Sequence, residues 1–146
     1  GLGRLDEARR EYAKALRQVS REARPAVHGF VRANLGRTLF KAGRWEEAAR
    51  AFSGAAASFA AQEARADALS MDLYRIECLA RMGAWSDARS AFDRFSDEVG
   101  RRGAVEPGLL RSLEAALSGA DPDFEGLVAL RSAAQDQVAT RLRRAI

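Results

Sequence analysis

Few side chains in this 146-residue chain could carry catalytic or metal chemistry. The single histidine, His28, has no second or third zinc ligand of the required type, and it would be the only imidazole for a catalytic triad. The single cysteine, Cys78, has no nearby Cys or His in sequence, so we expect a buried free thiol. Asp121, Asp123 and Glu125 alternate as in a calcium loop, but the central glycine and the final glutamate are missing, which favours a capped helix start. The sequence therefore predicts a protein that is not an enzyme and that uses no cofactor or metal ion.

The charge of the chain is basic, with 24 Lys and Arg against 20 Asp and Glu. Four arginines share one face of a predicted helix and three more lie near the end of the chain: Arg10, Arg17, Arg21 and Arg24, and Arg141, Arg143 and Arg144. Neither group is interleaved with aromatic residues, and acidic residues are interspersed along the chain, so an ordinary solvated surface is favoured. A nucleic-acid-associated helical domain that uses the arginine-rich face remains the alternative function.

One motif recurs along the chain at intervals of forty residues. It reads GRLDEA at positions 3–8, GRWEEA at 43–48 and GAWSDA at 83–88. An aromatic residue follows each copy, four positions after its alanine: Tyr12, Phe52 and Phe92. A repeat of this length is typical of solenoids that stack pairs of helices.

Each position of this motif has a physical reason. Glycine ends one helix where the chain turns, because it adopts positive φ without steric cost. The acidic residues then begin the next helix, beside the positive end of its dipole. The alanine lets a neighbouring helix approach closely, and the aromatic residue four positions later lies on the same face and fills the space. We expect seven helices with short loops, and therefore antiparallel neighbours, at 4–22, 25–42, 44–62, 64–82, 84–100, 106–118 and 122–143.

These residues resemble the tetratricopeptide repeat (TPR) family. The LGRTL segment at 35–39 is similar to the Leu-Gly-x-x-Tyr motif of the family's first helix, with leucine in place of tyrosine. The Ala-x-x-x-Phe motif of the second helix is matched at three places: Ala8 to Tyr12, Ala48 to Phe52 and Ala88 to Phe92. The period of forty, longer than the usual 34, resembles the extended repeats of bacterial regulators and kinesin light chain.

The resemblance implies an all-α fold, a right-handed TPR-like superhelix of antiparallel helix pairs. Repeats would occupy 1–102, as a half repeat at 1–24 and repeats at 25–62 and 63–102, and 103–146 would be a degenerate repeat or C-terminal capping helices. Because the chain begins on half a repeat, we expect a segment of a longer protein. The implied function is a protein–protein interaction scaffold, a regulatory segment of a larger bacterial cytoplasmic protein. No apolar run reaches the roughly 20 residues that span a bilayer, so we expect no membrane partner.

Family members bind peptides in a concave groove lined by the first helix of each pair. Carried onto this chain, the inward positions are Phe30, Asn34, Arg37 and Lys41 in one repeat, and Ser70, Tyr74, Glu77 and Arg81 in the next. Some members hold a peptide's terminal carboxylate with Asn, Lys and Arg; Asn34, Arg37 and Lys41 resemble such donors, and Glu77 would oppose an anion. The expected partner is a peptide, acidic where it meets these cations, or a helix that packs on Phe30, Phe40 or Tyr74.

Overall fold

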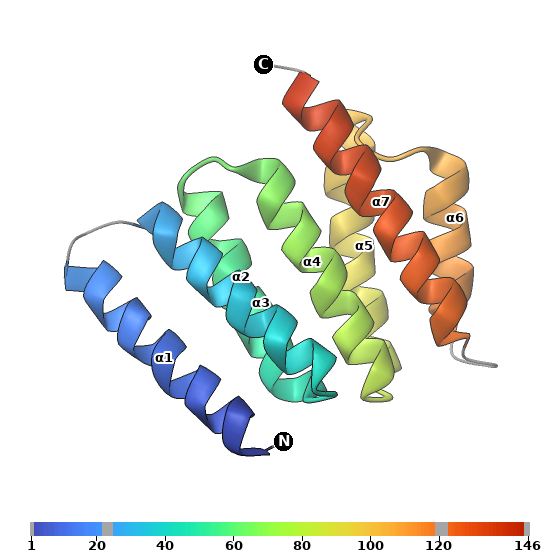
Figure 1. The fold of residues 1–146 in the computed structure, drawn as a ribbon. Coiled ribbons are helices and arrows are strands. Elements are labelled where there is room, and N and C mark those ends of the chain that lie inside the picture. Colours follow the sequence, from blue (N-terminus) through green and yellow to red (C-terminus); the bar gives the residue numbers. More distant parts are fainter. Residues whose placement is uncertain (1, 22–24, 119–122, 145–146) are drawn as a thin grey trace.

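The computed structural model describes residues 2–21, 25–118 and 123–144, and within these ranges it is all helical, without strands (Figure 1). Seven helices lie in these ranges: α1 Leu2–Arg21, α2 Pro25–Lys41, α3 Trp45–Ala61, α4 Arg65–Arg81, α5 Trp85–Arg102, α6 Pro107–Ala116 and α7 Phe124–Arg144. The predicted all-α class and the predicted number of helices are confirmed, and helix ends differ from the prediction by at most two residues.

The turns that follow α2 and α4 have the same geometry. Gly43 and Gly83 adopt φ of 74° and 77°. The next N–H donates back across the turn, from Arg44 to the Leu39 carbonyl and from Ala84 to the Leu79 carbonyl, both at 2.9 Å. These bonds satisfy carbonyl groups that the end of a helix leaves unpaired, and they require the left-handed conformation that glycine adopts readily. The forty-residue spacing of the glycines therefore positions two similar helix ends, as the sequence predicts.

Small residues bring α2 and α3 close together. A Cβ atom placed on Gly36 would lie 2.7 Å from the Phe52 ring, so this ring packs directly on the α2 backbone. Ala48 and Phe52 are both completely buried. Ala88 and Phe92, forty residues later, are buried in the same way on α5. The alternation of small and large residues read from the sequence is thus the packing surface of these helices.

The helices form two hydrophobic cores that meet at α4. One core gathers residues of α1 to α4 and includes Met71 and Cys78. The other gathers residues of α4 to α7 and includes Leu73 and Ile76. Because α4 contributes opposite sides to the two cores, it is the central helix of the molecule (Figure 1).

The last helix lies beside α4 although more than forty residues separate them (Figure 1). It runs antiparallel to α4, since Phe124 at its start lies against Arg81 and Gln135 reaches Ser70. Asp123 caps it by accepting a hydrogen bond from the N–H of Gly126 at 2.9 Å, as expected for a capped start. Asp121 and its neighbouring proline lie outside the described residues.

Candidate interaction site

Four of the predicted site residues form an exposed stripe on α2. Phe30, Asn34, Arg37 and Lys41 are all exposed, Phe30 to 56%, and their spacing places them on one helix face. Val27, exposed to 40%, extends the same face toward the start of the helix. We call these five residues the α2 stripe. Its apolar end is followed by a cationic end, and α2 contains no acidic residue.

The other four predicted residues lie beneath α7. Ser70, Tyr74, Glu77 and Arg81 follow the α2 stripe residues by forty positions, and none of them is exposed. The Gln135 side chain donates to the Ser70 carbonyl at 3.2 Å. The guanidinium carbon of Arg131 lies 4.5 Å from the centre of the Tyr74 ring. The structure thus separates the eight predicted residues into an exposed group on α2 and a group on α4 that a helix of the same chain covers.

Glu77 is the centre of the contact between α4 and α7. It is fully buried, and it accepts hydrogen bonds from Nε of Arg81 and Nε of Arg131, each at 2.9 Å. Arg131 also donates to Gln135 at 3.0 Å. Charge-assisted hydrogen bonds of this kind offset the cost of removing a carboxylate from water. Glu77 is therefore an internal anchor for α7, whereas the sequence suggested that it would repel an anionic ligand.

Aromatic rings surround the two arginines that bind Glu77. The guanidinium carbon of Arg81 lies 4.8 Å from the centre of the Trp45 ring and 4.9 Å from that of Phe124. Phe40 lies within 6.0 Å of both guanidinium groups and contacts Tyr74 edge-on at 5.6 Å. Cations placed on ring faces gain electrostatic attraction without an anion. This cluster joins α2, α3, α4 and α7.

Sequence reasoning missed the contribution of α7 to this cluster. Arg131 and Gln135 are spaced by four residues, so they lie on one face of the helix. That spacing was the only signal in the sequence, and it fits a solvated helix face equally well. Their partner, Glu77, is 54 residues away from Arg131, and no local pattern connects them.

The structure describes the side chains of three of the seven arginines in the two arginine-rich groups. Arg10 and Arg17 are exposed on α1. Arg141 pairs with Glu106 at 3.1 Å and donates to the Gly103 carbonyl. The side chains of the other four members, Arg21, Arg24, Arg143 and Arg144, lie outside the described part of the structure.

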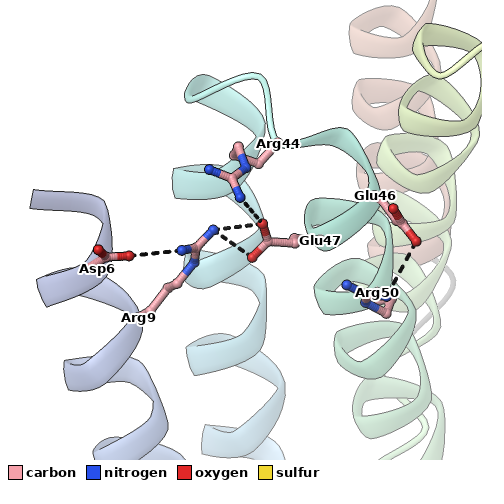
Figure 2. A network of polar contacts seen from close by, with 6 residues as sticks. All are labelled: Asp6, Arg9, Arg44, Glu46, Glu47 and Arg50. Atoms are coloured by element: carbon pink, nitrogen blue, oxygen red, sulfur yellow. Dashed lines mark hydrogen bonds and ion pairs between the residues drawn. The ribbon is translucent and has the colours of Figure 1, made fainter. Parts of the chain in front are cut away.

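A further network of ion pairs joins α1 to α3 (Figure 2). Arg9 of α1 lies between Asp6, at 3.0 Å, and Glu47 of α3, at 2.7 Å. Arg44 contacts the same Glu47 carboxylate at 2.8 Å. Sequence reasoning did not predict this network, because its central ion pair spans 38 residues.

Two groups on α4 have raised pKa values, the buried thiol of Cys78 and the half-buried carboxylate of Asp72. Burial, together with the neighbouring Glu77 carboxylate, raises the pKa of the Cys78 thiol to about 12, against the opposing effect of Arg81 and Arg131. The expectation of a buried free thiol is confirmed. Burial also raises the pKa of Asp72 to about 6, against the opposing effect of Arg75 and Arg94. Within the described ranges, no group of three or more His, Cys, Asp or Glu residues could hold a metal ion.

None of the helices in the described ranges combines the length and the apolar character needed to cross a bilayer. Comparison of the chain with family models, with curated proteins and with solved structures gives no match.

Proposed function

We propose that this chain is a TPR-like protein-interaction module that binds an acidic amphipathic helix or peptide along the α2 stripe. The observation that carries the proposal is a difference in exposure between two related helix faces. The face of α4 is covered by α7, whereas the α2 stripe, forty residues earlier, is exposed. The contact with α7 supports the view that this kind of face accepts a helix.

The charges on the two faces indicate what the partner should carry. On α4, Glu77 receives Arg131 from the covering helix. On α2, the corresponding position is Arg37, and Lys41 follows it one turn later. A helix bound to the α2 stripe should therefore carry an acidic residue where α7 carries Arg131. Val27 and Phe30 offer the apolar contact that an amphipathic helix needs.

The same proposal includes the fold, a right-handed superhelix, and the role, a scaffold without catalytic activity. We also propose that the chain is a regulatory segment of a larger bacterial cytoplasmic protein. The proposed fold is supported by the forty-residue period, the matching turns at Gly43 and Gly83, and the packing of small against large residues. The two cores that meet at α4 fit a stack of units, since each helix pair packs mainly on its neighbours.

A peptide derived from α7 provides a direct test. Two labelled peptides of residues 124–142 are compared by fluorescence anisotropy, one native and one carrying Arg131→Glu. We expect the R131E peptide to bind the protein at least tenfold more tightly than the native peptide, because it places a carboxylate opposite Arg37. Equal binding of the two peptides would count against the charge argument.

Variants of the protein complete this test. Arg37→Glu with Lys41→Glu should weaken binding of the R131E peptide at least tenfold and should favour the native peptide, with helicity unchanged by circular dichroism. Arg111→Glu, an exposed charge reversal on α6, is the matched control and should leave both affinities unchanged. If the R37E/K41E variant binds the R131E peptide as well as the native protein does, the α2 stripe is not the site. Salt-sensitive binding of duplex DNA or RNA would instead support the arginine-rich alternative.

A further inference from the structure

A cavity of about 500 Å³ lies between α1, α2 and α3. Its apolar lining comes from Leu16 of α1, Leu35 and Leu39 of α2, and Ala51 of α3. At about 100° per residue, Leu35 and Leu39 lie on the side of α2 roughly opposite the α2 stripe. The volume falls within the range of pockets that hold small organic molecules. This cavity is therefore a second site, separate from the proposed partner surface.

Arginines from all three helices also line this cavity. They are Arg9 of α1, Arg32 of α2 and Arg50 of α3. Among the described residues that line the cavity, Glu47 is the one carboxylate, and it is already paired with Arg9 at 2.7 Å and with Arg44 at 2.8 Å (Figure 2). Arg50 has only a loose pair with Glu46, at 3.5 Å, and both side chains are more than 70% exposed. The lining consequently carries an excess of positive charge.

Several hydrogen-bond donors of these arginines lack an acceptor at a short distance. Nη1 and Nη2 of Arg9 bind Asp6 and Glu47, but its Nε is buried and has no acceptor among the described residues. Among the described residues, Arg32 donates only to the Gly54 carbonyl, at 3.5 Å, which is long for a hydrogen bond. The Nε of Arg9 is closed to solvent, so Arg32 is the group with donors open to a ligand, and an oxygen placed closer to it in the cavity would be favoured.

We propose that this cavity binds a small anionic amphiphile, a carboxylate attached to an aliphatic body. The aliphatic body would pack on Leu16, Leu35 and Leu39, and the carboxylate would lie beside Arg32 and Arg50. Guanidinium groups suit this anion because their planar N–H groups match the two carboxylate oxygens. The proposal does not depend on the α2 stripe, and it concerns a free small molecule and not a lipid surface.

Octanoate is a suitable probe, and isothermal titration calorimetry measures its binding. We expect one octanoate per chain. Octan-1-ol, with the same body and no charge, and octylammonium, with the opposite charge, should bind at least tenfold more weakly. Octanoate binding should also weaken as salt is added, because the arginines are only partly buried. The proposal is overturned if octanoate does not bind or if octanol binds equally well.

Substitutions then locate the bound anion. Arg32→Gln combined with Arg50→Gln should weaken octanoate binding at least tenfold, while Arg111→Gln, an exposed arginine on α6, should leave it unchanged. Arg50→Gln alone tests the same point with little risk to folding, since Arg50 is 71% exposed, and it should cost a few-fold in affinity. Unchanged octanoate binding by the R32Q/R50Q variant would place the ligand elsewhere. Co-sedimentation with phosphatidylglycerol vesicles without binding of free octanoate would likewise overturn the proposal.

Discussion

The carboxylate of Glu77 has no contact with water, and its two partners come from different helices. Arg81 belongs to the same helix, whereas Arg131 reaches it from α7. Removing the carboxylate would leave two guanidinium groups in a largely apolar environment without an anion, with aromatic faces and, for Arg131, the Gln135 side chain as partners. The stability of the α4–α7 contact therefore depends strongly on one side chain.

We predict that Glu77→Ala lowers the free energy of unfolding by about 3 kcal/mol, since breaking a buried ion pair typically costs about 3–5 kcal/mol. Urea denaturation followed by circular dichroism measures this change. Glu114→Gln is the control, because Glu114 is 57% exposed and its pair with Arg89 is long, at 3.9 Å. That control should change stability by less than about 0.5 kcal/mol. An E77A variant as stable as the E114Q variant would contradict the anchoring role.

Asp72 gives the molecule a pH-dependent stability. Its pKa in the fold is about 6, above the ordinary value of 3.8, because burial disfavours the charged form. The folded state therefore binds this proton more tightly than the unfolded state does. The contribution of Asp72 to stability increases as the pH falls from about 6 to 3.8, and the burial cost is fully present above about 6.

We predict that Asp72→Asn stabilises the fold by about 1–2 kcal/mol at pH 7.5, because it removes a buried charge that Arg75 and Arg94 only partly compensate. The difference from the native protein should disappear near pH 4. Urea unfolding at the two pH values measures it, with exposed Asp93→Asn as the control. A D72N variant less stable than the native protein at pH 7.5 would show that the charged form is favoured in the fold.

At the scale of the helix, the packing of α2 on α3 explains why the sequence repeats small residues at fixed positions. Ala48 is fully buried, and the Phe52 ring lies against the backbone at Gly36. A larger residue at position 48 would have to push the two helices apart. Ala57, on the same helix, is exposed and has no such restriction.

We predict that Ala48→Trp lowers the free energy of unfolding by about 1–3 kcal/mol, the usual cost of overpacking a buried position. Its melting temperature should fall by several degrees, while Ala57→Trp should leave the melting temperature nearly unchanged. A48W with an unchanged melting temperature would mean that position 48 does not face a neighbouring helix.

The helices themselves were predictable because their signals are local. Gly43 and Gly83 adopt the positive φ that lets the chain turn at the end of a helix, and acidic first turns begin the helices that follow. The position of α7 was not predictable, because it depends on an ion pair between Glu77 and Arg131 that no spacing rule encodes. For the same reason, sequence reasoning placed all eight site residues on one open face, whereas the structure leaves only those of α2 exposed.

At the scale of the whole molecule, α4 belongs to both hydrophobic cores, and α7 closes the second one. Leu127, Ala134 and Val138 of α7 are almost fully buried in that core. The last helix is thus part of the folded unit, and it is also the helix that covers half of the predicted partner-binding face. Of the eight predicted positions, only the four on α2 remain exposed, on a helix that lies away from α6 (Figure 1).

Cys78 occupies the part of α4 that faces the first core, and it is completely buried. It is also the only thiol in the chain. A thiol reagent can therefore modify this protein at one place only, and only while that core is open. The rate of labelling would report how often the core formed by α1 to α4 opens under native conditions. Cys78 is thus a built-in probe of local unfolding.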